Sequence, residues 1–409
     1  MLESAPPQNL KRSLTLLLAV LYGLGVTIGA GIYVLVGIAA GRSGMHAPLA
    51  FVVAALVMSF SAASFAELGT RMPVSASEAA YVEKAFNRPW LSLIMGLLVV
   101  LTATISAATI SVGSAGYLGV FVDLPAQWII TLVVVSMGLV ACLSTRQSVT
   151  LAGTMTLIEL GGLMVIIATG FWAGSGVVTR LPEIWPASGD IAIWVGLSGT
   201  TLIAVFAFIG FEHLVNVAEE MKNPSRTLPW ALFLTLGITA LVYALVVWVA
   251  VVAVPLDELA RSTAPLALVF ERLTGMPLKT MSVIAVIATL NGIIVHVIMI
   301  SRVLYGLATQ GNLPKVLTHL NARTGTPLLA TAIGVAAILA LALAVPLAGL
   351  ADLTARFTLV VFAIINITLI RIKSMETAAP EHVFVCPGWV PVAGLVSSIG
   401  LLLLDLIVR

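Results

Sequence analysis

Long apolar runs alternate with short polar connections along the whole chain. About 20 apolar residues are enough for a helix to cross the hydrocarbon core of a bilayer. By this criterion the pattern predicts roughly eleven membrane-spanning helices. Their expected ranges are 14–40, 47–68, 91–120, 127–143, 149–172, 191–217, 230–254, 281–307, 328–346, 350–370 and 390–408. No polar stretch between them is long enough for a separate soluble domain.

The composition agrees with this pattern. Hydrophobic residues make up 60% of the 409 positions and charged residues 9%, and the mean hydropathy is +1.12. A soluble domain carries about a quarter charged residues, so we expect a polytopic membrane protein. The formal charge of +2 and the lack of a basic run argue against a nucleic-acid partner. Cys142 and Cys386 fit no metal or disulfide framework, and no cofactor is expected.

The basic residues predict an orientation. With the N-terminus inside, thirteen of the 20 lysine and arginine residues fall on the cytoplasmic side and seven on the other. The positive-inside rule therefore favours a cytoplasmic N-terminus. The polar lead with Lys11 and Arg12 lacks a cleavage site, which indicates an uncleaved first helix. We expect a multi-pass protein of the plasma membrane, the inner membrane of a bacterium.

The first span contains GLGVTIGAGIYVLVGIAAG at 23–41, and its glycines can be explained in two ways. Each glycine inside a helix costs roughly 1 kcal/mol relative to alanine. The cluster from Gly29 to Gly31 could let the helix unwind at mid-membrane and turn backbone groups toward a cavity. Alternatively, Gly25, Gly29 and Gly37 could let neighbouring helices approach closely. Glycine content alone favours close packing.

The sixth span changes that balance. It contains FAFIGFEHLVNVAEE at 206–220, in which Glu212 and His213 follow Gly210. A charged side chain near the centre of a membrane helix costs about 2.5–3.5 kcal/mol. The first and sixth spans are equivalent members of two five-helix halves. Transporters built from inverted repeats place broken helices and a midplane binding site at such positions, so we predict a break in both spans.

Several motifs also resemble the amino acid, polyamine and organocation (APC) permeases. They are Gly29-Ala30-Gly31-Ile32, FAELGTRMPVSASEAAYVEKAFNRP from Phe65, FAFIGFEHLVNVAEEMKNPSRTLPWAL from Phe206, SRVLYGLATQGNLP from Ser301 and FVCPGWVP from Phe384. The resemblance implies a leucine-transporter-type fold, with inverted repeats at 1–173 and 174–373 and an additional helix at 374–409. The family usually continues into a twelfth helix, for which this sequence has no equivalent.

The resemblance also implies a substrate site. The backbone at Gly29, Ala30 and Gly31 would hold a substrate carboxylate, and carbonyls near Phe206, Ala207 and Ile209 would accept from its ammonium. Phe206 matches an aromatic gate, and the helices would hinge at Gly29–Gly31 and Ile209–Gly210. The full set of expected substrate-binding residues is Thr27, Gly29, Ala30, Gly31, Ile32, Phe206, Ala207, Ile209 and Gly210.

Glu159 in the fifth span departs from the family pattern, in which many members have a lysine. A carboxyl group could hold a cation, and burial that disfavours its charged form would let it carry a proton. Its alternative role is structural hydrogen bonding, but intramembrane acids are functional by default. Glu212, Thr289 and Asn291 are the other expected coupling residues, the last two facing the first and fifth spans.

Two imidazoles and one cation have simpler expected roles. We interpret His213 and His296 as hydrogen-bonding residues between packed helices, and we expect Arg302 to reach the interface or to pair with an acid such as Glu67.

The preferred interpretation is a secondary transporter of an amino acid or related amine, importing it with protons by alternating access. Exchange, sodium coupling and a non-transporting sensor remain open. No catalytic motif or phosphate loop supports an enzyme, and no filter sequence supports a channel. The phenylalanine-rich sixth span leans toward a neutral substrate, while Glu159 could pair with a cationic one. The sequence does not determine the oligomeric state.

Overall fold

The computed structural model describes residues 14–73, 77–143, 149–173, 176–186, 189–321, 324–376 and 381–408. Apart from a β-bridge between Leu14 and Met221, these residues form helices and their connections. The predicted all-α architecture is therefore confirmed. Lys11 and Arg12 lie outside the described residues, as do other cations used for the orientation, namely Arg146, Arg323 and Arg409.

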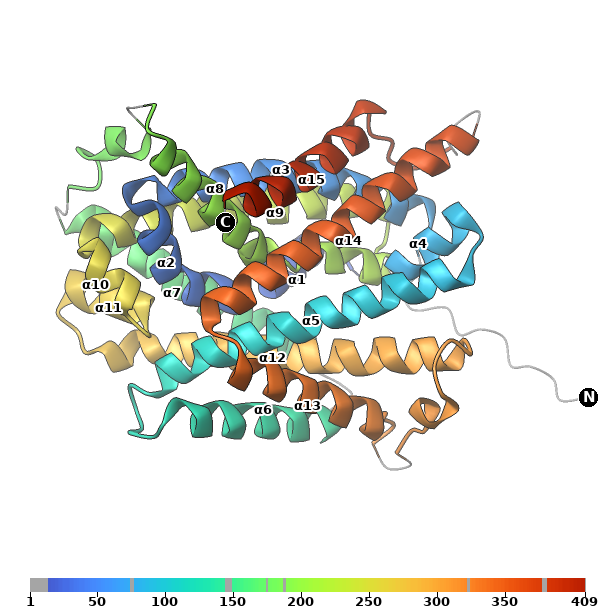
Figure 1. Cartoon of the computed structure of the whole chain (residues 1–409), viewed down its shortest axis with the longest axis horizontal. Coiled ribbons are helices and arrows are strands. Elements are labelled where there is room, and N and C mark those ends of the chain that lie inside the picture. Colours follow the sequence, from blue (N-terminus) through green and yellow to red (C-terminus); the bar gives the residue numbers. More distant parts are fainter. Residues whose placement is uncertain are drawn as a thin grey trace, which may run out of the picture.

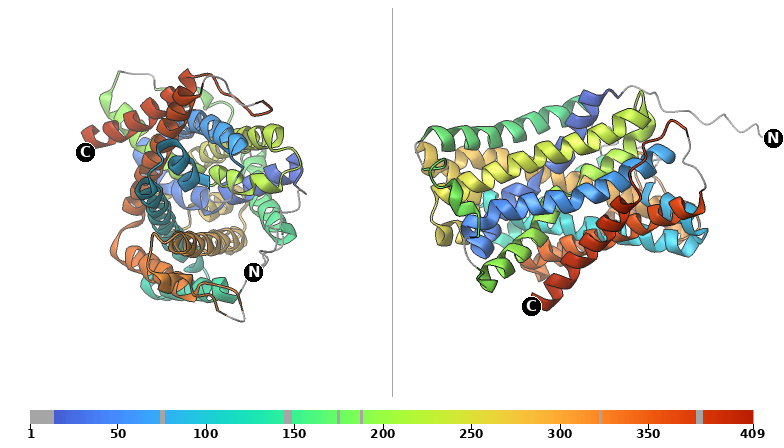
Figure 2. Two further views of the ribbon diagram at one scale, coloured as in Figure 1. Left: turned by 90° about the vertical axis from the view of Figure 1, so that its right-hand side faces the viewer. Right: turned by 90° about the horizontal axis from the view of Figure 1, so that it is seen from above.

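Eleven long helical units in the described residues run along the longest axis of the molecule (Figures 1 and 2). Two units consist of two pieces each, α1 (Leu16–Thr27) with α2 (Ala30–Ser43), and α8 (Ile191–Phe208) with the 3₁₀ helix η3 (Phe211–Glu220). The others are α3 (Ala47–Arg71), α5 (Pro89–Leu118), α6 (Ala126–Leu143), α7 (Val149–Trp172), α9 (Pro224–Ala253), α12 (Leu278–Thr309), α13 (Leu328–Ala344), α14 (Leu347–Met375) and α15 (Trp389–Val408).

Short helices mark the two ends of the bundle (Figure 1). We call one end the Glu67 end; it carries α4 (Ser77–Phe86) and η4 (Lys315–Thr318). The other, the Arg42 end, carries η1 (Gly44–His46), η2 (Leu181–Ile184), α10 (Leu256–Arg261) and α11 (Pro265–Thr274). Each unbroken long helix runs from one end to the other, as a membrane crossing requires.

Helix length and hydropathy support membrane embedding. Eight helical stretches of the described chain are long and apolar enough to cross a bilayer, and three shorter apolar helices accompany them. With 12 residues, α1 is too short to cross alone and needs α2. When each broken pair is one crossing, the eleven units match the eleven predicted spans. The protein is thus a multi-pass integral membrane protein.

Tryptophan side chains mark the two expected membrane surfaces. Seven of the eight tryptophans are exposed and lie close to a helix end, whereas Trp248 is buried. Tryptophan is enriched at the headgroup level because its ring is apolar and its N–H is polar. The exposed ones at the Glu67 end are Trp90, Trp230 and Trp389, and those at the Arg42 end are Trp128, Trp172, Trp185 and Trp194.

Helix α9 differs from its prediction at its start. It begins at Pro224, so Pro229 lies inside the helix and does not stop one as expected. Proline at the first helical position suits the helix, because its missing N–H would have had no partner there. Pro229 lacks only its own N–H, and neighbouring helices make such a gap tolerable in a membrane helix.

Aromatic side chains fill the core on both sides of the α8–η3 break. They pack edge-on or tilted, an arrangement that aromatic quadrupoles favour. One cluster holds Phe51, Phe208 and Tyr243, and the other holds Phe65, Phe211 and Phe362. Because α3 supplies Phe51 and Phe65, it supports both halves of the sixth span.

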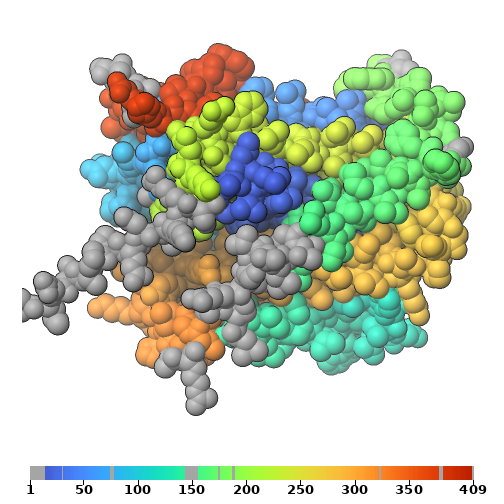
Figure 3. Space-filling view, turned by 180° about the vertical axis from the view of Figure 1, so that it is seen from behind, coloured from blue at the N-terminus to red at the C-terminus, as the bar shows by residue number. Residues whose placement is uncertain are grey.

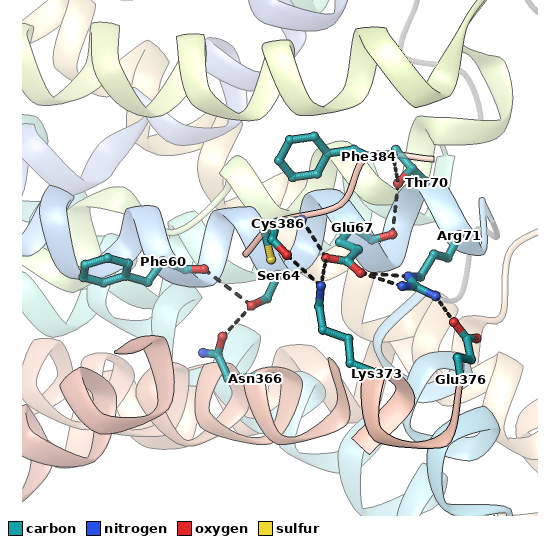
Figure 4. Close-up of polar contacts among 10 residues, drawn as sticks. All are labelled: Phe60, Ser64, Glu67, Thr70, Arg71, Asn366, Lys373, Glu376, Phe384 and Cys386. Atoms are coloured by element: carbon teal, nitrogen blue, oxygen red, sulfur yellow. Dashed lines mark hydrogen bonds and ion pairs between the residues drawn. The ribbon is translucent and has the colours of Figure 1, made fainter. Parts of the chain in front are cut away.

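A network of charges fixes α3 to α14 at the Glu67 end (Figure 4). The side chain of Glu67 has no exposed surface. Arg71 donates to its Oε1 at 2.7 Å, Lys373 Nζ lies 2.7 Å from Oε2, and the N–H of Cys386 donates to Oε2 at 2.8 Å. Arg71 also pairs with Glu376. The segment before α15 is held in the same network through Cys386.

This pairing corrects one expectation. Arg302 is exposed, while Glu67 is buried and already bound to Arg71 and Lys373. The suggested pair between Arg302 and Glu67 is therefore wrong, and reaching toward the interface is the alternative that agrees with the exposure of Arg302.

Candidate functional site

The first span is interrupted between α1 and α2 at Ile28 and Gly29. The N–H of Ile28 still donates to Leu24 O at 2.7 Å, and no backbone hydrogen bond in the described chain joins α1 to α2. The first N–H groups of α2, beginning at Ala30, have no acceptor within their own helix. Together with the helix dipole, such N–H groups form a site suited to an anion.

The glycines of this span divide between the two explanations. A Cβ on Gly25 would lie 2.0 Å from Thr156 Oγ1, and one on Gly37 would lie 2.8 Å from Leu259 O. These two glycines allow close helix packing. Gly29 has only Val26 O within 4 Å of such a Cβ, at 3.8 Å, so it serves the break and not the packing. Both explanations hold, at different positions.

The sixth span is interrupted at Ile209 and Gly210, as predicted. Gly210 has φ +129°, a conformation that other residues rarely adopt. Its N–H donates to Glu212 Oε2 at 2.8 Å, so the carboxyl group closes the break from within. The carbonyl of Phe206 accepts from Ile209 N–H, and those of Ala207 and Ile209 have no backbone donor in the described chain. Free carbonyls of this kind suit an ammonium group.

The two breaks touch each other through their backbones. A Cβ on Gly31 would come 3.0 Å from Ala207 Cα, and one on Gly210 would come 2.7 Å from Val26 O. The free N–H end of α2 therefore faces the carbonyl end of α8. On its other side α1 reaches the molecular surface between α7 and α9, as Figure 3 shows.

A cavity of about 40 Å³ lies at the breaks, and its walls also include α5 and α12. It is lined by Gly25, Val26, Thr27, Gly29, Gly31, Ser106, Ile110, Phe206, Ala207, Ile209, Asn291, Gly292, Val295 and His296. Seven residues predicted from the sequence are among them, namely Thr27, Gly29, Gly31, Phe206, Ala207, Ile209 and Asn291. The α5 wall was missed, and the small polar Ser106 in a run of small residues was its one signal.

Other predicted residues lie elsewhere. Ala30 is the first residue of α2, and Ile32 is fully buried in packing. Gly210 lies against Val26, outside the cavity lining. Thr289 Oγ1 contacts Ser114 of α5 at 3.1 Å, so its hydroxyl faces the third span, not the first and fifth.

Glu159 on α7 lies beside the first break. Its backbone carbonyl accepts from Tyr33 Oη at 2.9 Å, which ties α7 to α2. Its carboxyl group has no exposed surface, and neither oxygen has a hydrogen-bond partner among the described residues. Asn291 faces it without reaching hydrogen-bond geometry, and the hydroxyl of Thr27 is also buried without a partner.

This environment limits what the carboxyl group can be. A carboxylate buried without a cation or donors is costly. The group is therefore stable here as a neutral acid, or with a cation brought to it. Glu159 thus has the chemistry of a proton carrier or a cation ligand.

Tyrosine hydroxyls hold the backbone around the first break in place. Tyr243 of α9 donates to Thr27 O at 2.7 Å, at the last residue of α1. Tyr117 of α5 donates to Tyr33 O at 2.5 Å. These buried donors satisfy carbonyls that would otherwise lack partners, so α1 and α2 stay separate helices within a rigid frame.

Comparison with known proteins gives a consistent result over almost the whole chain. A sequence model of the family described as "Amino acid permease" matches residues 14–408. An uncharacterized transporter of Mycobacterium tuberculosis is 29% identical over 398 residues, which cover 96% of this chain and 86% of the relative.

Two further relatives have more specific names. The branched-chain amino acid permease BcaP of Bacillus subtilis is 26% identical over 417 residues, covering 95% of this chain and 86% of that protein. The vacuolar cationic amino acid transporter 2 of Arabidopsis thaliana is 28% identical over 389 residues, covering 89% of this chain and 60% of that protein.

Proposed function

Because the chain belongs to the amino acid permease family, we propose that it carries an amino acid or a related amine across the plasma membrane by alternating access, as a proton-coupled importer. Amino acid transport follows from the family, and the coupling and direction are the proposed parts. The observation that supports the proposal is the pair of touching helix breaks around one cavity. Free N–H groups on one side and free carbonyls on the other complement a zwitterion.

The alternation would come from α1–α2 and α8–η3, which can bend at Ile28–Gly29 and Ile209–Gly210. A cavity of about 40 Å³ holds little more than one water, whose share of the liquid is about 30 Å³. An amino acid therefore enters only when helices part, which fits a mechanism with closed and open states.

Glu159 is the proposed proton carrier. Its buried, unpartnered carboxyl group supports this role, because a group that is stable when neutral can take up a proton and release it when the surroundings open. Glu212 at the second break is the secondary candidate. We place the N-terminus and the Glu67 end in the cytoplasm, since most basic residues lie at that end.

Uptake of radiolabelled amino acids and amines into proteoliposomes tests the proposal. An inward proton gradient should drive accumulation of one class of substrate, and Glu159→Gln should remove that stimulation. Glu183→Gln, an exposed carboxyl group that pairs with Arg180 at the Arg42 end, serves as the control. Equal stimulation in wild type and Glu159→Gln would refute the role of Glu159.

Two further arms separate the alternatives. Stimulation by a sodium gradient alone would identify sodium as the coupling ion. Uptake that requires substrate preloaded inside would identify an exchanger, and binding without flux under every gradient would identify a sensor.

A further inference from the structure

A second cavity of about 40 Å³ adjoins the first on the side of the Glu67 end. The two share Ser106, Ile209 and His296 in their linings. The second one continues between α4, α5, η3, α12 and α14, and we call it the lower cavity. No residue of the lower cavity except Glu212 was assigned a role from the sequence.

The polar groups of the lower cavity are mostly hydrogen-bond acceptors. Thr102 Oγ1 donates to Leu98 O at 2.8 Å and Thr358 Oγ1 to Thr354 O at 2.9 Å, so each hydroxyl has spent its proton within its own helix. His296 Nδ1 lies 2.8 Å from Gly292 O. A carbonyl only accepts, so Nδ1 carries the hydrogen and Nε2 of the neutral ring is an acceptor.

Two carboxyl groups add to this excess of acceptors. Glu212 is 7% exposed and Glu78 of α4 is half-buried, and both line the lower cavity with His213. No lysine or arginine occurs among the described residues of its lining. Acidic groups near one another in a low-dielectric space favour a positively charged occupant.

The size of the lower cavity limits that occupant. About 40 Å³ has room for the end of a side chain and not for a second amino acid. Because the two cavities share three lining residues, a substrate whose main-chain atoms lie at the breaks could extend its side chain past His296 into the lower cavity.

Resting on the proposed function, we infer that the lower cavity holds the distal cationic group of the substrate. The substrate is then a basic amino acid or a diamine, with its terminal ammonium or guanidinium group beside Glu212, Glu78 and His296 Nε2. Such groups bring three or five N–H donors to a space that offers acceptors. A hydrated proton has the same chemistry, and the experiment separates the two.

Competition binding to the full-length protein in detergent tests the inference without the influence of membrane potential. Two pairs of probes differ mainly in the distal charge, L-lysine against L-norleucine and L-arginine against L-citrulline. We expect the charged member of each pair to compete at least about tenfold better, because a site built for donors rejects an analogue that lacks them.

Variants connect that preference to the lower cavity. Glu212→Gln keeps an acceptor oxygen for Gly210 N–H and removes the charge, and Glu78→Gln removes the second charge from another helix. Each should reduce the preference for the charged probe by about tenfold, and Glu183→Gln should leave it unchanged. Melting curves in detergent confirm that each variant is folded, and Glu78→Gln carries the test alone where Glu212→Gln does not fold.

Three outcomes would overturn the inference. The first is equal competition by norleucine and lysine in wild type, and the second is a preference that survives in both variants. The third is a neutral substrate whose uptake loses its proton dependence in Glu212→Gln, which would assign the lower cavity to a proton. All three leave amino acid transport intact, whereas failure of every amino acid and amine to bind would refute the proposed function itself.

Discussion

Two glutamates of this protein, Glu67 and Glu159, are both buried without exposed surface, yet their surroundings are opposite. Glu67 receives hydrogen bonds from Arg71 and Cys386 and pairs with Lys373 as well. Both oxygens of Glu159 lack partners in the described part of the chain. Burial of an acid is thus a poor guide to its role.

The satisfaction of the oxygens separates the two regions. A buried charge with full pairing fixes one arrangement of helices, and removing one partner leaves the others uncompensated. A buried acid without partners is available for a change of protonation or for a ligand. The network around Glu67 should therefore respond to mutation in stability, and the region of the breaks should respond in transport.

The largest loss of stability is expected for Glu67→Gln. Arg71 and Lys373 would be left near each other in a buried site, which costs about 3–5 kcal/mol. Chemical unfolding of the purified protein in detergent measures the change. Glu376→Gln is the matched control, since its carboxyl group is partly exposed and such pairs contribute about 0–1 kcal/mol. Equal losses in the two variants would contradict the comparison.

Gly210→Ala should come next, at about 1–3 kcal/mol. Alanine at φ +129° is strained, and its Cβ would lie 2.7 Å from Val26 O. Because this position joins the two breaks, uptake should fall more than stability does. Gly237→Ala is a suitable control, since a Cβ there meets nothing within 4 Å. Wild-type uptake in folded Gly210→Ala would remove the hinge from the proposed mechanism.

Glu159→Gln should change the unfolding free energy by less than about 1 kcal/mol, because no ion pair is broken. The same variant should lose the dependence of uptake on the proton gradient. Unfolding in detergent and uptake in proteoliposomes, measured on one preparation, test both parts. A loss of stability as large as that of Glu67→Gln would show that the two acids have the same structural role.

The smallest change is expected at Cys386, which reports on the network. Burial, and then the neighbouring Glu67, raise the pKa of the Cys386 thiol from 9.0 to about 12. Between pH 7 and pH 9 the thiolate fraction is therefore about a thousandfold below that of an exposed cysteine, and alkylation should be slow. In a Cys142→Ser background, maleimide labelling followed by mass measures it, and Glu67→Gln should accelerate it. Rapid labelling of the folded parent would contradict the network as described.

The sequence predicted the helices and the breaks because both depend on local composition. Hydropathy locates each span, and Gly29 and Gly210 mark the interruptions. The fold class is confirmed, while the division into inverted repeats and the roles of the site residues remain predictions. The network around Glu67 could not be predicted, since Lys373 and Cys386 lie about 300 residues away.

Local composition also misled at two points. Glu78 was read as part of a solvated segment, yet α4 folds so that Glu78 lines the lower cavity. His296 resembled a packing residue, and its ring instead forms the wall between two cavities. In both cases the decisive fact is which other helix lies opposite, and sequence periodicity contains no information about that.

The touching breaks also have a consequence for how this protein can change over generations. Under the proposed function, the carboxylate and ammonium common to all amino acids meet main-chain groups at Gly29, Gly31 and Ala207. No single codon change deletes a main-chain N–H or C=O group. Variation at side chains such as His296 can therefore alter which amino acid is carried while recognition of the shared atoms is inherited, so that selectivity evolves without an inactive intermediate.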